Sequence, residues 1–186
     1  MKRIFDIVAA IALAILLVAP MLFIALLVKL TSKGPVLYWS DRVGVNNKTF
    51  RMPKFRTMQV DTPVVAKHLL VNPDRYLTPI GPLLRRFGLD EFPQLWGVLK
   101  GDMSFVGPRP ALYNQYDLIE LRTKKGIHML VPGVTGWAQI QKNSGPAIPV
   151  KVEYDDYYLR HRSFLFDMKI IFLTFSKVIK GEGVTH

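Results

Sequence analysis

The stretch that decides the fold of this chain is Leu89-Asp-Glu-Phe-Pro-Gln-Leu-Trp-Gly-Val-Leu-Lys-Gly-Asp-Met-Ser-Phe-Val-Gly-Pro-Arg-Pro110. It places two adjacent carboxylates, Asp90 and Glu91, where a helix is predicted to begin, and it ends in Arg109 between two prolines. Asp is a favoured N-cap, and carboxylates at a helix N-terminus are kept ionised by the macrodipole and the free backbone N–H groups. An ionised Asp90 can act as a nucleophile or bind a metal ion. The simpler alternative is that Asp90 only caps the helix.

The helix that follows Asp90 is predicted from its apolar spacing. Leu95, Val98 and Leu99 form one apolar stripe, and Gly101 is a typical helix stop. The stretch therefore predicts a helix that begins at Asp90 and ends before Gly101, followed by a Gly-Pro-Arg-Pro segment.

The composition limits the classes of protein to which the chain can belong. Its 186 residues predict one domain plus, at most, a small appendage, and 49% hydrophobic residues are ample for a core. The chain contains no cysteine, which excludes a disulfide framework and a thiolate nucleophile, and its four histidines are scattered. The net charge of +11 is spread along the chain and predicts anionic partners, such as acidic lipid, phosphorylated substrates or nucleic acid.

An uncharged segment of 22 residues, Ile7 to Val28, is long enough to cross a bilayer core about 30 Å thick. No cleavage site of small residues accompanies it, so a signal peptide is not predicted. Positive charges lie on both sides of the segment, which favours keeping both of its ends in the cytoplasm. Pro20 removes one helix hydrogen bond and bends the chain. These features predict a re-entrant membrane helix-hairpin, and the alternative is an ordinary tilted span with a proline kink.

The remaining pattern predicts an α+β fold that is mostly helical. Strands at 36–40 and 49–52, joined by a turn at 45–48, predict a β-hairpin. Helices are expected at 82–87, 113–125, 149–160 and 164–179. The last of these is apolar nearly all round and is either core or an amphipathic helix at the membrane interface. Asp155 and Asp156 are expected on a solvated helix face, with metal binding as the alternative.

The sequence resembles the bacterial sugar transferase family, the monotopic phosphoglycosyl transferases. Members carry Leu-Asp-Glu followed by Leu-Lys-Gly-Asp-Met-Ser-Phe-Val-Gly-Pro-Arg-Pro, and this chain has that string almost intact. The resemblance also covers the membrane segment, Lys54-Phe-Arg-Thr-Met58 and Val131-Pro-Gly-Val-Thr-Gly-Trp-Ala-Gln139. In the last block, small residues are expected to let the backbone approach a ligand, or to form a tight turn. Two departures are Ala19-Pro20 in place of the usual Ser-Pro, and Gln141-Lys142-Asn143 where many members have Asn-Gly-Arg.

The resemblance implies an enzyme that transfers a sugar phosphate from a UDP-sugar to polyprenyl (undecaprenyl) phosphate. The products are a polyprenyl-diphospho-sugar and UMP, which is the first membrane step in assembling an O-antigen, capsule, exopolysaccharide or glycoprotein glycan. It implies that Asp90 is the nucleophile and a Mg²⁺ ligand, and that Glu91 assists catalysis, either as an acid beside Asp90 or as a partner of the metal ion. Lys54, Arg85 and Arg109 are implied to bind the phosphates, because attack of one anion on another needs cations that neutralise the developing charge.

The expected organisation is a re-entrant membrane helix over residues 1–30 and a cytosolic, membrane-associated catalytic domain over residues 31–186. That domain is expected at the cytoplasmic face of the bacterial inner membrane, with UDP-sugar, polyprenyl phosphate and membrane lipid as partners and Mg²⁺ as cofactor. A homodimer is left open. No nucleic-acid partner is expected, because the sequence has no helix-turn-helix, RNA-binding or zinc-finger signature. The rival hypothesis is a non-catalytic membrane scaffold of a glycan-assembly complex, which leaves the acidic pair unexplained.

Overall fold

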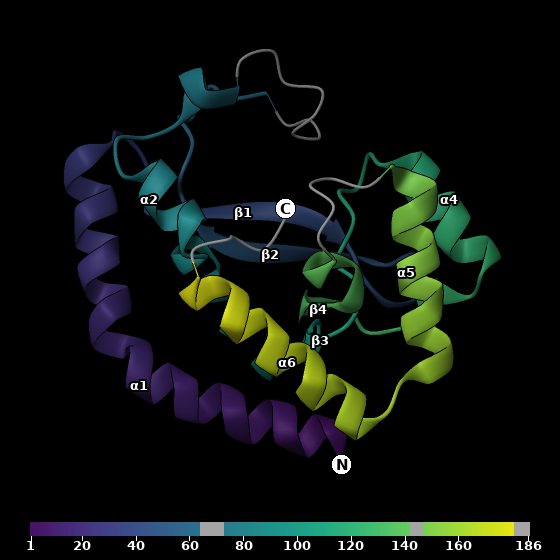
Figure 1. The fold of residues 1–186 in the computed structure, drawn as a ribbon. Coiled ribbons are helices and arrows are strands. Elements are labelled where there is room, and N and C mark those ends of the chain that lie inside the picture. Colours follow the sequence, from purple (N-terminus) through teal and green to yellow (C-terminus); the bar gives the residue numbers. More distant parts are fainter. Residues whose placement is uncertain (64–72, 142–146, 181–186) are drawn as a thin grey trace.

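The computed structural model describes residues 1–63, 73–141 and 147–180 (Figure 1). Short 3-10 helices are written η. In chain order the elements are α1 (Lys2–Thr31), β1 (Leu37–Val43), η1 (Val45–Asn47), β2 (Thr49–Phe55), η3 (Pro73–Tyr76), α2 (Gly81–Arg86), η4 (Leu89–Gln94), α3 (Leu95–Lys100), β3 (Ser104–Val106), α4 (Tyr116–Lys124), η5 (Ile127–Met129), β4 (Gly133–Thr135), η6 (Trp137–Ile140), α5 (Ile148–His161) and α6 (Phe164–Ile179). These elements confirm the predicted α+β class and its mostly helical character.

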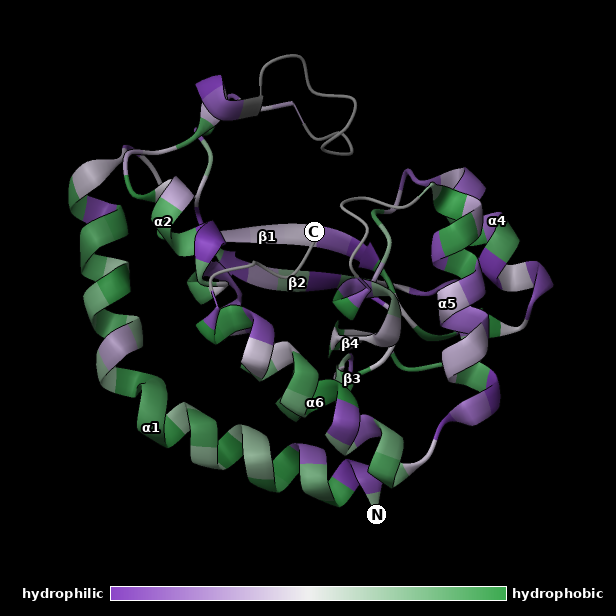
Figure 2. Cartoon of the chain, in the orientation of Figure 1, coloured by the Kyte–Doolittle hydropathy of each residue, from purple (hydrophilic) through white to green (hydrophobic). Residues whose placement is uncertain are grey.

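The N-terminal apolar segment forms one long helix, α1, which bends part-way along its length while remaining a single helix (Figure 1). Pro20 lies inside it. Ala10 in its first half and Ile24 and Val28 in its second half are buried against the rest of the protein. Most of its large apolar side chains are exposed, and Figure 2 shows that the helix is hydrophobic along nearly its whole length. Among the described residues, α1 is the one helix long and apolar enough to cross a membrane.

The predicted β-hairpin is present and is longer than the sequence indicated. Strands β1 and β2 pair antiparallel, from Leu37 opposite Phe55 to Val43 opposite Thr49. The connection carries two asparagines in the left-handed region, which asparagine tolerates better than most residues. Because β2 continues to Phe55, Lys54 lies within a strand and is held by the hairpin.

A second, two-stranded parallel pair joins β3 to β4, with Ser104 opposite Gly133 and Val106 opposite Thr135. Glycines at the ends of these strands pack backbone against backbone. A Cβ atom added to Gly133 would overlap the backbone nitrogen of Gly107, and one added to Gly136 would overlap the carbonyl oxygen of Gly107. The glycines of the block at 131–139 therefore allow two chain segments to touch, a role that the sequence did not suggest.

Helices α4, α5 and α6 enclose the main hydrophobic core, and the expected helices at 113–125, 149–160 and 164–179 are confirmed. The buried members of this core are Val106, Ala111, Leu118, Ile127, Leu130, Ile140, Val152, Tyr158 and Ile170. Helix α6 begins at a favourable cap, since the Ser163 hydroxyl accepts a hydrogen bond from the Phe166 N–H at 3.1 Å. The expectation that Asp155 lies on a solvated face is wrong, because that side chain is buried in an ion pair with Arg122.

Candidate active site

The five site residues expected from the sequence come from three elements and the segment after β3, and they meet in one place. Asp90 and Glu91 lie in η4, Lys54 lies in β2, Arg85 lies in α2, and Arg109 follows β3. The η4 helix packs against β2. Lys54, Arg85 and Arg109 are all near enough to Asp90 to lower the pKa of its carboxyl group. The site is therefore an acidic pair surrounded by three cations.

The helix start differs from the expected one. The residue before the first turn is Gly88, in the left-handed region at φ 65°, and no side chain caps the helix there. Asp90 lies inside the 3-10 turn of η4, and α3 begins only at Leu95. A proline disfavours the α conformation in the residue before it, so Pro93 explains why the chain enters the helix through a 3-10 turn. The end of α3 is as predicted, because Gly101 adopts φ 99°.

Glu91 holds two of the three cations. Its Oε1 atom accepts a hydrogen bond from Lys54 Nζ at 2.6 Å and from Arg109 Nη2 at 2.5 Å, and its Oε2 atom lies 3.4 Å from Arg109 Nη1. All three side chains are largely buried, with exposed fractions of 9–15%. Burial lowers the pKa of Arg109, but the charge and hydrogen bond of Glu91, together with the charge of Asp90, outweigh burial and raise that pKa above its ordinary value. Burial also lowers the pKa of Lys54, to about 8, although Glu91 opposes this.

Asp90 is buried beside this group, with an exposed fraction of 5%. Its Oδ1 atom has no hydrogen-bond partner in the described parts of the chain. Burial raises the pKa of the Asp90 carboxyl above its ordinary value and Glu91 adds to this, while Lys54, Arg85 and Arg109 oppose it. Asp90 lies in the first turn of η4, as expected, but no side chain caps that helix. The three cations are what favour its charged form.

Arg85 is oriented by a residue that the sequence did not suggest. Its Nε atom donates a hydrogen bond to the Thr57 hydroxyl at 2.9 Å. Thr57 is buried just after β2 and belongs to the Lys-Phe-Arg-Thr-Met stretch. The hairpin thus positions two of the three cations, Lys54 directly and Arg85 through Thr57.

The Pro108-Arg109-Pro110 segment is held by its carbonyl groups, since neither proline has an N–H to donate. The Pro108 carbonyl accepts from the Gly133 N–H at 3.0 Å, and the Arg109 carbonyl accepts from Arg122 Nη1 at 2.8 Å. The Pro110 carbonyl accepts from Arg42 Nη1 at 3.2 Å. Each of the three carbonyl oxygens therefore has a donor, and two of these donors are arginines.

Arg42 and Lys151 are further cations near Arg109 that the sequence analysis did not select. Burial and the neighbouring Arg109 lower the pKa of Arg42 to about 10. Burial and the neighbouring Arg122 lower the pKa of Lys151 to about 8. The expected strand ended at residue 40, so it did not include Arg42, which lies on β1 opposite Phe50. Positive charge gathered at this density favours an anionic ligand.

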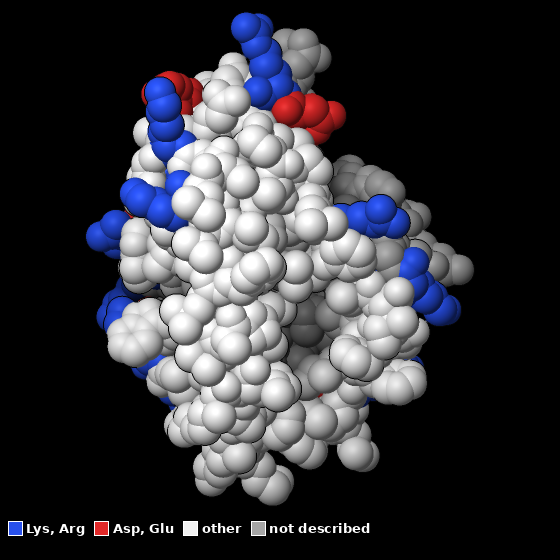
Figure 3. Space-filling model, turned by 90° about the vertical axis from the view of Figure 1, so that its left-hand side faces the viewer, with Lys and Arg blue, Asp and Glu red and all other residues white. Residues whose placement is uncertain are grey.

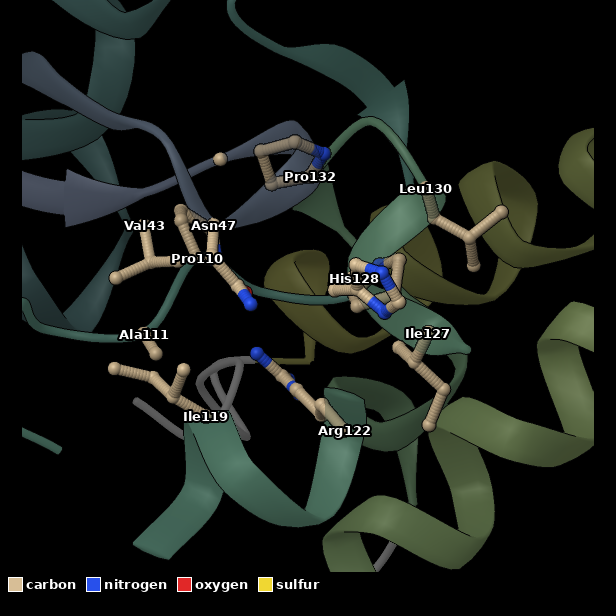
Figure 4. A pocket seen from close by; sticks show the side chains of 12 residues that line it. Val43, Asn47, Pro110, Ala111, Ile119, Arg122, Ile127, His128, Leu130 and Pro132 are labelled. Atoms are coloured by element: carbon tan, nitrogen blue, oxygen red, sulfur yellow. The ribbon is translucent and has the colours of Figure 1, made fainter. Parts of the chain in front are cut away.

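A pocket of about 350 Å³, including the solvent space at its mouth, lies against Pro108 and Pro110 (Figure 4). Figure 4 shows Arg122 reaching from its helix toward the side of the pocket where Pro110 lies. None of the five site residues lines this pocket. It therefore lies behind the Pro-Arg-Pro segment and is separate from Asp90.

This arrangement suits chemistry on a phosphate group. A buried carboxylate beside several cations can attack a phosphorus atom, while the cations neutralise the charge of the phosphate oxygens. Arginine offers a planar fork that matches these oxygens, and Glu91 already holds the fork of Arg109 in one orientation.

Comparison with known proteins shows the class to which this fold and site belong. The family model described as bacterial sugar transferase matches residues 1–181, and the chain belongs to that family. It is 40% identical over 186 residues to an uncharacterized sugar transferase, EpsL, of Bacillus subtilis (strain 168), covering 99% of this chain and 90% of that protein. The protein is thus a transferase by family.

Two relatives have names that state a reaction. A UDP-glucose:undecaprenyl-phosphate glucose-1-phosphate transferase of Escherichia coli (strain K12) is 44% identical over 97% of this chain and 40% of its own length. A UDP-N-acetylgalactosamine-undecaprenyl-phosphate N-acetylgalactosaminephosphotransferase of Aeromonas hydrophila is 38% identical over 98% of this chain and 44% of its own length. This chain spans less than half of each of these two relatives.

Proposed function

We propose that the protein transfers a sugar 1-phosphate from a UDP-sugar to undecaprenyl phosphate and releases UMP. The observation that carries the proposal is the buried Asp90 among Lys54, Arg85 and Arg109, with Glu91 holding two of these cations. Both substrates are anionic at the reacting groups, so the reaction requires cations that neutralise the charge on the phosphate oxygens. The two relatives above bear names with this reaction but with different sugars. The scaffold hypothesis gains no support from relatives that are named as transferases.

The mechanism we propose is a double displacement at Asp90. A carboxylate oxygen of Asp90 attacks the phosphorus that carries the sugar, and the bond from that phosphorus to the bridging oxygen breaks as UMP leaves with the electron pair. An oxygen of undecaprenyl phosphate then attacks the same phosphorus and displaces Asp90, which regains its carboxylate. Two easier steps replace one difficult step. Arg85 and Lys54 favour the ionised Asp90 that the first step needs.

Mg²⁺ fits the site as a cofactor. Asp90 Oδ1 is a buried oxygen without a hydrogen-bond partner in the described residues, and oxygen is the ligand atom that Mg²⁺ prefers. No group of three metal-ligating side chains occurs among the described residues. Mg²⁺ is commonly held by one or two carboxylates together with substrate phosphates, so Asp90 alone suffices on the protein side. The chemistry that Mg²⁺ supplies when bound is neutralisation of the charge on the diphosphate.

The proposed location is a membrane surface, at the cytoplasmic face of the inner membrane. Figure 3 shows that the side of the molecule with the second half of α1 is mostly uncharged, with Lys and Arg side chains along its margins and a few acidic side chains near the top. Helix α6 adds exposed apolar side chains, among them Leu165, Phe172, Phe175 and Ile179. Apolar surface bordered by basic residues suits insertion among anionic lipid headgroups.

The re-entrant path of α1 is supported by contacts at both of its ends. At the N-terminal end Lys2 Nζ donates to the Val106 carbonyl at 2.9 Å, and Arg3 donates to the carbonyls of Val98 and Leu99 at 2.6 and 2.8 Å. The C-terminal end is attached to the same domain elsewhere. There Arg56 Nη2 donates to the carbonyl and the hydroxyl of Ser32 at 3.0 and 2.8 Å.

A helix with both ends on one domain has both ends on one side of the membrane. This is the observation behind the proposed topology.

The function is tested by mixing the purified protein with undecaprenyl phosphate and a panel of UDP-sugars that includes UDP-glucose and UDP-N-acetylgalactosamine. We expect UMP release with at least one sugar. With the UDP-sugar alone, we expect about one UMP per active site and a sugar phosphate on the peptide that contains Asp90, because the first step needs no acceptor.

Asp90→Asn should abolish both signals, and Asp117→Asn, at an exposed carboxylate of α4, should leave them unchanged. Direct attack by undecaprenyl phosphate, with Asp90 only holding Mg²⁺, predicts no adduct and no UMP without acceptor. A stable absence of adduct in an active preparation would refute the covalent mechanism while leaving the overall reaction standing.

A further inference from the structure

Arg122 and Asp155 form a buried ion pair outside the residues assigned above. Arg122 lies in α4 and Asp155 in α5, and their exposed fractions are 7% and 2%. Arg122 Nε and Nη2 donate to Asp155 Oδ2 at 3.0 and 2.6 Å. The remaining nitrogen, Nη1, donates to the backbone carbonyl of Arg109 at 2.8 Å. The guanidinium of Arg122 thus connects α4 and α5 to Arg109, the residue that forms an ion pair with Glu91.

Stability alone is a weak reason for this pair. Removing two charges from water costs about as much as their attraction returns, and apolar residues of similar volume often replace a buried ion pair without loss. The pair also lies beside the apolar core under α4 and α5, where Leu118 and Val152 are fully buried. Apolar replacements would fill the space, but they could not donate a hydrogen bond to Arg109.

The bond to the Arg109 carbonyl fixes the part of the backbone that the prolines leave undetermined. The rings of Pro108 and Pro110 set their own φ angles. The direction of the Arg109 carbonyl sets the peptide plane between Arg109 and Pro110, and therefore ψ of Arg109. With both flanking φ angles and this plane fixed, the side chain of Arg109 leaves the backbone in one direction, toward Glu91.

We propose that Arg122 and Asp155 are a positioning pair that holds Arg109 in the orientation needed to bind the phosphate. This rests on the proposed function, in which Arg109 binds phosphate. Asp155 accepts two hydrogen bonds that fix the guanidinium of Arg122. The third hydrogen bond of Arg122, to the Arg109 carbonyl, fixes the backbone of Arg109 in turn. Arginine is required because lysine has one nitrogen and cannot span both partners in the fixed geometry of a fork.

The test is Arg122→Lys, alone and combined with Arg109→Lys. In the single variant we expect kcat/KM for the UDP-sugar to fall about 10- to 100-fold, because a displacement of about 1 Å near the chemistry has effects of that size. In the Arg109→Lys background, the same change should have little further effect, since residues that act through one group are not additive. If the two losses multiply, Arg122 does not act through Arg109 and the proposal is wrong.

A second measurement does not depend on activity. Backbone hydrogen exchange of the 104–112 segment should be faster in Arg122→Lys than in wild type, while the protein stays folded. Asp155→Asn keeps an acceptor for Arg122, so it should increase the exchange rate less than Asp155→Ala does. The matched control is Val152→Ala, on the same helix α5, which should lower Tm without changing kcat or selectively loosening that segment. Unchanged exchange in both Arg122→Lys and Asp155→Ala would overturn the proposal. An inactive wild-type protein would instead refute the proposed function.

Discussion

Glu91 is the residue around which the site is organised, because both cations that it binds are also the natural ligands of a phosphate. Lys54 and Arg109 donate to the same oxygen of Glu91, so an incoming phosphate must share these donors or displace the carboxylate. In the proposed function, Glu91 thereby keeps two buried cations in place before substrate arrives. This gives Glu91 a role distinct from that of Asp90, although the two are adjacent in sequence.

The pKa of Lys54, lowered to about 8 by burial, predicts how the reaction depends on pH. Lys54 is positively charged below this value, so kcat/KM for the UDP-sugar should fall as pH rises through about 8. Glu91 and Asp90 raise this pKa, while Arg109 and Arg42 lower it. Glu91→Gln removes the charge that raises the Lys54 pKa most. The alkaline fall in kcat/KM should therefore begin at a lower pH, and kcat/KM at pH 7 should decrease.

The measurement is the pH dependence of kcat/KM from about pH 6 to 10. This parameter reports the pKa values of essential groups in the free enzyme. Lys54→Arg is the control, because arginine stays charged throughout this range and should remove the alkaline fall. An unshifted profile in Glu91→Gln would show that another group causes the fall.

Arg109→Lys tests the fork itself. The substitution keeps a positive charge but loses the two parallel donors that match Glu91 and a phosphate. We expect turnover to fall by about 10²- to 10³-fold, the usual effect of removing one donor to a developing charge. Thermal unfolding should be close to wild type, and near-normal turnover would mean that Arg109 has only a structural role.

At the scale of elements, the β3–β4 pair places Arg109 because glycines allow the two strand ends to touch. Gly107 precedes the Pro-Arg-Pro segment, and its backbone lies against Gly133 and Gly136. The strand pair is parallel and very short, so its position depends on this contact more than on its few ladder hydrogen bonds.

Gly133→Ala should separate the two strand ends, because the added Cβ atom would overlap the backbone nitrogen of Gly107. We expect a loss of about 1–3 kcal/mol in the free energy of unfolding, as for other overpacked sites, and a loss of turnover through Arg109. Gly97→Ala in α3 is the control, since its Cβ would only make ordinary contact with the Met103 side chain, at 3.4 Å. Comparable Tm values for the two variants would contradict the proposed role of the contact.

At the scale of the whole molecule, α1 encircles part of the domain and is attached to it at both ends (Figure 1). Asp6, a charged residue near the start of an otherwise apolar helix, is buried and accepts a hydrogen bond from the Phe105 N–H at 3.2 Å. Lys2 and Asp6 therefore anchor the helix to the same strand, β3, that leads to Arg109.

This attachment predicts that the N-terminus and the catalytic domain share one face of the membrane. The chain has no cysteine, so a cysteine inserted after Met1 and another at Lys48→Cys can be labelled individually in intact cells. Both should be protected from an impermeant thiol reagent and become labelled only after permeabilisation. Val18→Cys, in the exposed apolar middle of α1, should stay protected by lipid in both conditions. Labelling of the N-terminal cysteine alone in intact cells would show that α1 spans the bilayer.

Much of the fold was predictable because its elements follow from near neighbours in sequence. The apolar run of α1, the hairpin and the end of α3 at Gly101 all have local causes, and the long string at 89–110 marked Asp90, Glu91 and Arg109. The start of the helix at Asp90 was wrong because Pro93 and the left-handed Gly88 outweigh the preference of Asp for an N-cap. The departure at Gln141-Lys142-Asn143 falls mostly outside the described residues.

The class of protein, the long apolar N-terminal helix and the residue types of the candidate site follow from composition, spacing and motif. Which charges are paired depends on the folded path of the chain. Glu91 meets Lys54 and Arg109 across separations of 37 and 18 residues, and Arg122 meets Asp155 across 33. Such pairs are set by the path of the folded chain, and burial then changes the pKa values that the isolated residues would have. A solvated Asp155 and a capping Asp90 were reasonable for the local sequence, but the packing of α4 on α5 and of η4 on β2 removed both from water.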